Sequence, residues 1–148
     1  MLGHRCRLQL YGGAELSVRP GFGALFAGSF IASLATGGIR LFLHWIGSRV
    51  LGWWLFVAFE IGVVFACLAF ACIASMFLGK EMATRWLWVG GALFLCSIGA
   101  HFLIVMNSSQ SPAALTSILF VTALAGQAAC TAGLARVLAE SHWASAGA

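Results

Sequence analysis

The sequence predicts an all-α membrane protein, in which residues 1–148 form a single antiparallel bundle of four transmembrane helices. Two of the observations behind this prediction are compositional: 61% of the residues are hydrophobic and only 8% are charged. Soluble domains carry about 25% charged residues, and a soluble core of this length could not bury so much apolar surface. The third observation is that four apolar runs reach the roughly 20 residues that a helix needs to cross a bilayer.

A short segment, residues 1–20, precedes the first apolar run. We expect the four spans at residues 21–46, 50–78, 86–106 and 113–135. Polar breaks separate them at residues 47–49, 79–85 and 107–112, and connections this short place neighbouring helices antiparallel. "SLA" at 33–35 resembles a signal-peptide cleavage site, but the apolar run continues past it to Trp45, which favours a retained first helix.

The tryptophans and basic residues indicate where these spans meet the membrane surface. All six Trp lie at or just beyond predicted span ends, as amphipathic rings do at interfaces: Trp45, Trp53, Trp54, Trp86, Trp88 and Trp143. One side of the predicted membrane holds most of the basic residues: Arg5, Arg7, Arg19, Lys80, Arg85 and Arg136. The other side holds Arg49. The excess of positive charge predicts cytoplasmic termini, and we expect a bacterial inner membrane.

Each predicted span carries its polar side chains along one face. On the first span they recur at helical spacing, and on the second Glu60 stands seven residues from Cys67. The polar side chains of the first, third and fourth spans are Ser29, Ser33, Thr36, Arg40 and His44, then Ser97, His101 and Ser108, then Thr116, Gln127 and Thr131. Because polar groups facing lipid would be unsatisfied, we expect these stripes to face one another inside the bundle.

Arg40, Glu60 and His101 are predicted at one depth, about 7–11 Å below the outer interface by helical rise. His44 lies above them and Gln127 below. Ionisable groups inside membrane spans usually mark function, so these five residues are a candidate ligand, ion or proton site. The structural alternative is that Arg40 and Glu60 form a buried pair that fixes helix register, with His101 as a third hydrogen-bond partner.

The cofactor is unknown from sequence. A b-type haem held between His44 and His101 is one alternative, and a transition metal bound by Glu60 with these two imidazoles is another. Neither catalysis nor nucleic-acid binding is expected, because no nucleophile stands beside a base and no basic stripe is present. Of the five Cys, four lie inside apolar runs and none is in CxxC spacing, which predicts buried thiols rather than a disulfide or zinc framework.

Small residues indicate where helices pack. They recur every four positions at Ala24, Gly28 and Ala32, and again at Ala58, Gly62 and Ala66. On the fourth span Ala125, Ala129 and Gly133 lie roughly opposite Gln127, which predicts an outward strip for another transmembrane helix, in a hetero-complex or a homo-oligomer. The sequence therefore favours a non-catalytic subunit that stabilises or anchors a larger membrane complex. The alternatives are a small homo-oligomeric transporter or channel, and a haem- or quinone-binding redox protein.

Overall fold

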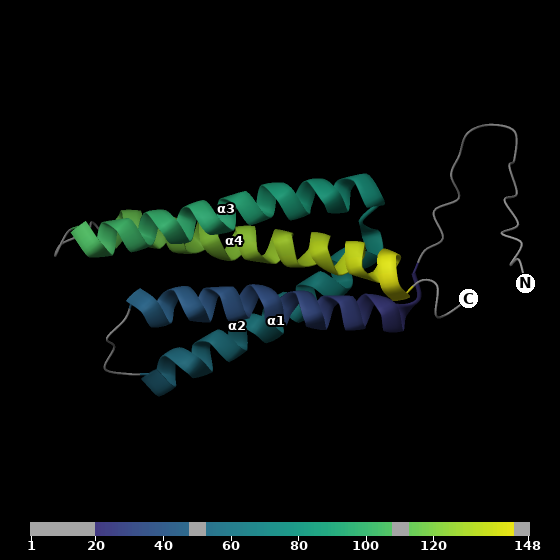
Figure 1. The fold of residues 1–148 in the computed structure, drawn as a ribbon, viewed down its shortest axis with the longest axis horizontal. Coiled ribbons are helices and arrows are strands. Elements are labelled where there is room, and N and C mark those ends of the chain that lie inside the picture. Colours follow the sequence, from purple (N-terminus) through teal and green to yellow (C-terminus); the bar gives the residue numbers. More distant parts are fainter. Residues whose placement is uncertain (1–19, 48–52, 108–112, 144–148) are drawn as a thin grey trace, which may run out of the picture.

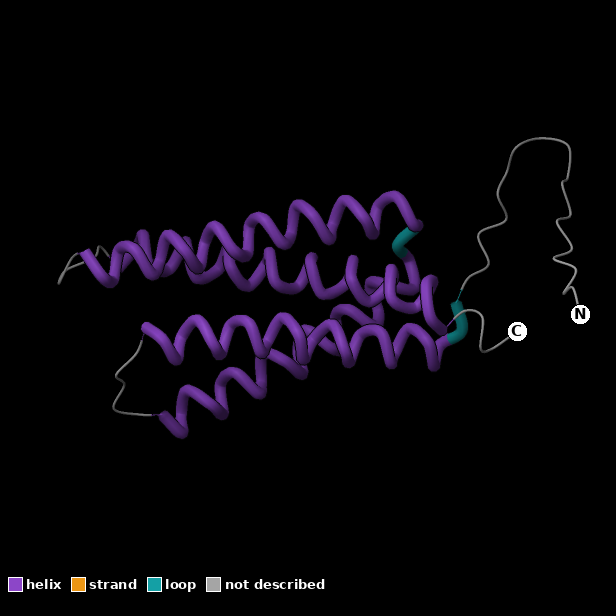
Figure 2. Tube along the Cα trace, viewed as in Figure 1, coloured by secondary structure: helices purple, strands orange, loops and turns teal. Residues whose placement is uncertain are grey.

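The computed structural model describes residues 20–47, 53–107 and 113–143. These residues form four α-helices and a short π-helix: α1 (Phe22–Gly47), α2 (Trp53–Phe77), α3 (Lys80–Asn107), α4 (Ala113–Leu138) and η1 (Ala139–Trp143) (Figures 1 and 2). All four α-helices are long and apolar enough to cross a membrane. The predicted all-helical class is therefore confirmed for the described residues.

Two helix ends differ from the predicted spans. α3 begins at Lys80 rather than at residue 86, so the second break consists only of Leu78 and Gly79. Ala83 N–H already donates to the Gly79 carbonyl at 2.9 Å, and Glu81 in the first turn interacts favourably with the helix dipole. α4 likewise runs past residue 135 to Leu138. Hydropathy locates the apolar part of a helix, whereas the backbone hydrogen bonds continue into its charged ends.

Three of the helices, α1, α2 and α4, contact one another, and α3 lies chiefly against α4. Figure 1 shows α3 and α4 side by side along most of their length, with α1 next to α4 and α2 crossing α1 at an angle. Gly28 lies against Ala135, and Arg40 contacts Gln127, so α1 and α4 run in opposite directions. Arg40 also contacts Glu60 of α2. The centre of this arrangement is therefore the space shared by α1, α2 and α4.

Glycines bring α3 and α4 into backbone contact. A Cβ on Gly126 would lie 2.6 Å from Phe94 N, and one on Gly133 would lie 2.6 Å from Leu87 N. A Cβ on Gly90 would lie 2.6 Å from the backbone N of the facing α4 residue. Only glycine permits so close an approach, which increases the van der Waals contact between the two backbones.

This contact changes the interpretation of Ala125, Ala129 and Gly133. Gly133 packs on the α3 backbone, and Ala129 Cβ lies 2.9 Å from where a Cβ of Gly90 would be. Ala125 is exposed. The expectation that the strip faces outward is therefore wrong for Ala129 and Gly133, because the close crossing with α3 requires the smallest residues of α4.

Many polar side chains lie inside the helix assembly, and many large apolar side chains lie on its outside. Phe65 is 63% exposed and Trp88 is 73% exposed, whereas Arg40 and Glu60 are each 1% exposed. The buried polar and charged side chains are Ser29, Ser33, Thr36, Arg40, Glu60, Ser75, Ser97, Gln127, Thr131 and Arg136. Burial confirms the predicted inward orientation for the stripe residues in this list, whereas Ser75 and Arg136 did not belong to the predicted stripes. Soluble proteins show the reverse distribution.

We expect Gly133→Ala to lower the thermal unfolding temperature in detergent, because the new methyl group would overlap the α3 backbone. Overpacking of this kind costs about 1–3 kcal/mol. Gly99→Ala on α3 is the matched control, since no atom lies within 4 Å of its Cβ position. Alanine is the better helix former by up to about 1 kcal/mol, so the control should be as stable as the wild type or more so. Equal stability of the two variants would contradict the close α3–α4 contact.

Candidate functional site

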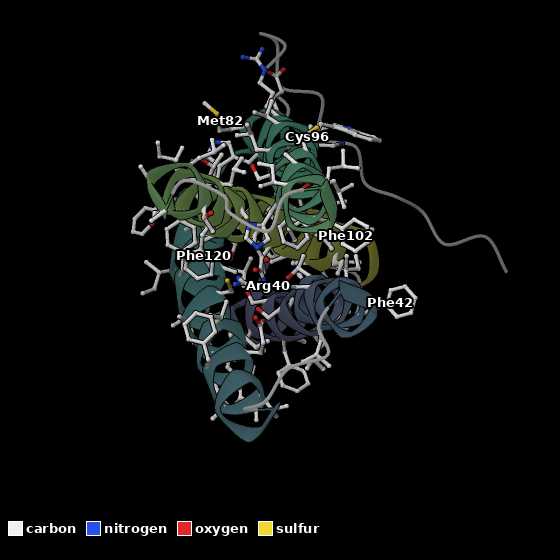
Figure 3. The ribbon with its side chains drawn as sticks, turned by 90° about the vertical axis from the view of Figure 1, so that its left-hand side faces the viewer. Arg40, Phe42, Met82, Cys96, Phe102 and Phe120 are labelled. Atoms are coloured by element: carbon white, nitrogen blue, oxygen red, sulfur yellow. The ribbon has the colours of Figure 1, made fainter. Side chains whose placement is uncertain are left out.

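The candidate site is centred on Arg40, which α1 places between α2 and α4. Its Nε lies 3.0 Å from Oε1 of Glu60 in an ion pair. Its Nη1 donates a hydrogen bond to Oε1 of Gln127 at 3.1 Å. One guanidinium thus joins three helices, and Figure 3 shows Arg40 at the centre of the assembly when viewed along the helices. We call Arg40, Glu60 and Gln127 the Arg40 site.

Two aromatic rings flank the same guanidinium. Arg40 Cζ lies 5.3 Å from the centroid of the Phe120 ring and 5.8 Å from that of Phe59. The two centroids are 5.9 Å apart. Cation–π attraction at such distances contributes about 0.5–2 kcal/mol. Both rings are partly exposed, at 39% and 47%, so this Phe59–Phe120 pair covers Arg40 on the side between α2 and α4.

The Arg40 site contains polar atoms that no described residue satisfies. Oε2 of Glu60 accepts no hydrogen bond from a described residue, whereas Oε1 is paired with Arg40 Nε. Gln127 Nε2 likewise donates none. Gln127 presents its amide oxygen to Arg40, because arginine only donates hydrogen bonds. Buried polar groups are costly unless they are hydrogen-bonded, so these atoms are available for a further molecule.

The structure brings together three of the five predicted site residues. Gln127, rather than His101, provides the hydrogen-bond partner of Arg40 on α4, and no hydrogen bond or ion pair joins His101 to Arg40 or Glu60 among the described residues. His101 is half-buried on α3, which has few contacts with α1 and α2. His44 lies in α1, but its side chain is outside the described part. The haem and transition-metal alternatives, which need His44, stay predictions.

Hydroxyl groups continue the polar contact between α1 and α4 beyond the Arg40 site. The hydroxyl oxygens of Thr36 and Thr131 are 3.0 Å apart. Thr131 also donates to the Gln127 carbonyl at 2.7 Å, and Thr36 lies 3.0 Å from the Ala32 carbonyl. These hydroxyls are satisfied by their own helices, so they position α1 against α4 and leave no unmet hydrogen bond. Ser33 differs, because its buried hydroxyl has no partner among the described residues.

A second buried arginine was not anticipated from the sequence, which placed Arg136 among the basic residues of the cytoplasmic surface. Arg136 is 3% exposed, and its Nε donates to Glu140 Oε1 at 2.8 Å. Its Nη1 donates to the Ser75 carbonyl at 3.2 Å, in the last turn of α2. A cation there satisfies a helix carbonyl and interacts favourably with the helix dipole. The available signal was Glu140, four residues after Arg136 and therefore on the same helix face.

Comparisons of the chain with protein-family models, with curated proteins and with solved structures find no match. The functional argument therefore rests on the geometry of the chain itself.

We expect Arg40→Ala and Glu60→Ala to destabilise the protein separately, because each leaves a buried charge uncompensated, at about 3–5 kcal/mol. The double variant should lose clearly less than the sum of the two. Unfolding in detergent measures this cycle. The control cycle combines Arg40→Ala with Arg136→Ala, and these two effects should add. Arg40 contacts α4 at Gln127, which is about 13 Å from Arg136 by helical rise. Additive losses for Arg40 and Glu60 would contradict the pair.

Proposed function

We propose that this chain is an integral membrane protein that crosses a lipid bilayer four times as an antiparallel bundle. Support comes from the burial of Arg40, Glu60 and Gln127 together with the exposure of large apolar side chains on each of the four α-helices. Contact of such an apolar surface with lipid tails carries no free-energy cost, whereas its contact with water is unfavourable. We further propose that both termini lie in the cytoplasm of a bacterial inner membrane, on the strength of the Lys and Arg distribution.

Reporter fusions test this orientation. A reporter that is active only outside the cytoplasm should be inactive when fused after residue 148, because the positive charges favour a cytoplasmic end. The same reporter inserted after Arg49, in the first break, should be active. Activity at residue 148 together with inactivity at Arg49 would reverse the orientation.

Within the membrane, we propose that the protein is a non-catalytic subunit that binds another transmembrane helix through α2. The observation that carries this proposal is the face formed by Ala58, Gly62 and Ala66, all of which are exposed. No atom lies within 4 Å of the Cβ position of Gly62. At the helix crossings described above, a neighbouring backbone packs directly on such small residues, as the backbone of Ala135 packs on Gly28. Small residues allow the same close approach from a second chain.

Native mass spectrometry of gently solubilised membranes tests this interface with Gly62→Leu. The larger side chain would separate the two backbones, and we expect the assembled fraction to fall by about tenfold, which corresponds to roughly 1.4 kcal/mol. Gly99→Leu on α3 is the matched control, since its Cβ position is equally open. A wild-type protein that is monomeric, or equal losses in both variants, would contradict an interface on α2.

A second candidate function is that of a small homo-oligomeric transporter or channel that uses the Arg40 site. It is favoured by the unsatisfied Oε2 of Glu60 and the unsatisfied Nε2 of Gln127, both on residues that are at most 1% exposed. A pair that only fixed helix register would need no such free hydrogen-bonding capacity. This candidate and the subunit role use different surfaces, so their tests are independent.

A further inference from the structure

We propose that the Arg40 site binds a small uncharged molecule that both donates and accepts hydrogen bonds, with water as its smallest member. The proposal deepens the transport candidate by naming its ligand class, and it rests on that candidate only for the location of the site. A molecule can occupy the site without being transported. The unsatisfied atoms of Glu60 and Gln127 carry the inference.

The charges of the site indicate an uncharged ligand. Arg40 and Glu60 carry opposite charges and lie 3.0 Å apart, and the third member, Gln127, is neutral. The charges of these three residues balance, so a charged ligand would add one net charge among residues that are at most 1% exposed. An uncompensated charge in such surroundings is strongly unfavourable, whereas a neutral ligand leaves the balance unchanged.

The unsatisfied atoms specify what the ligand must offer. A carboxylate oxygen of Glu60 only accepts, so the ligand needs a donor. The Nε2 group of Gln127 only donates, so the ligand also needs an acceptor. Both residues contact the same guanidinium, Glu60 at Nε and Gln127 at Nη1. Water, simple alcohols and amides meet both requirements, whereas an apolar molecule meets neither.

The Phe59–Phe120 pair lines the apolar side of the site. Both rings stand between Arg40 and the exterior, and they come from different helices, α2 and α4. Phenylalanine offers no hydrogen bond, so the rings close the site without competing for its polar atoms. Both rings are partly exposed, at 47% and 39%, so the site lies behind two apolar side chains from different helices.

Radiolytic hydroxyl-radical labelling of the full chain in lipid nanodiscs tests occupancy. Radicals formed from water held at the Arg40 site oxidise the nearest rings, so Phe59 and Phe120 should be labelled several-fold more than Phe65. Phe65 is the internal control, because it lies on α2 as Phe59 does and is 63% exposed. Labelling of Phe59 and Phe120 no greater than that of Phe65 in the wild type would overturn the proposal without any variant.

Gln127→Met then tests the role of the amide, because methionine keeps the length of the side chain and removes the donor. We expect the labelling of Phe59 and Phe120 to fall to the level of Phe65. Undiminished labelling in this variant would overturn the assignment of Gln127. Thermal unfolding in detergent establishes whether the variant is folded. If it is not, the comparison of Phe59 and Phe120 with Phe65 in the wild type still tests the proposal.

The charge requirement is tested by repeating the wild-type labelling with glycerol or sodium acetate at equal osmolality, scaled to Phe65. Protection of Phe59 and Phe120 by glycerol supports a neutral ligand larger than water. Protection by neither solute supports water alone as the ligand. Protection by acetate but not by glycerol would overturn the proposal of a neutral ligand. Liposome flux of glycerol and water is measured separately, so that a bound but untransported ligand removes the transport candidate and leaves the inference intact.

Discussion

Arg40 places a guanidinium cation inside the helix assembly, where it is 1% exposed. A cation in such surroundings must be balanced by its neighbours. Glu60 supplies the opposite charge from α2, Gln127 supplies a hydrogen-bond acceptor from α4, and two phenylalanine rings supply their negative faces. The packing of α1, α2 and α4 about a common centre follows from these contacts. Without the cation, none of these contacts with Arg40 would form.

The second ion pair has a different character, although it is also formed by an arginine and a glutamate. Arg136 and Glu140 belong to one stretch of chain, so the pair needs no tertiary structure to form. What it adds is the hydrogen bond to the Ser75 carbonyl, which ties the end of α4 to the end of α2. One pair therefore specifies which helices meet, and the other holds two helix ends together after they have met.

Spacing along single helices allowed much of the site to be predicted. The intervals between Thr36 and Arg40 and between Gln127 and Thr131 place each pair on one face, and all four side chains are buried. The predicted depth in the membrane was sufficient to pair Arg40 with Glu60. It was insufficient to predict the position of His101, because a count of residues gives height along a helix but does not show that α3 packs on α4 rather than on α1. The same limit applies to Gly133, whose small size indicates close packing without indicating the partner.

Arg40 also has a consequence for the order in which the chain acquires its structure. Its helix, α1, is made before α2 and α4, which carry Glu60 and Gln127. In the proposed bilayer, α1 alone carries an uncompensated cation, which is unfavourable inside a membrane span. Entry of α2 brings the neutralising carboxylate, so the first two helices become stable in lipid as a hairpin rather than one at a time. The last helix then completes the hydrogen bonds of a centre that was already electrically neutral.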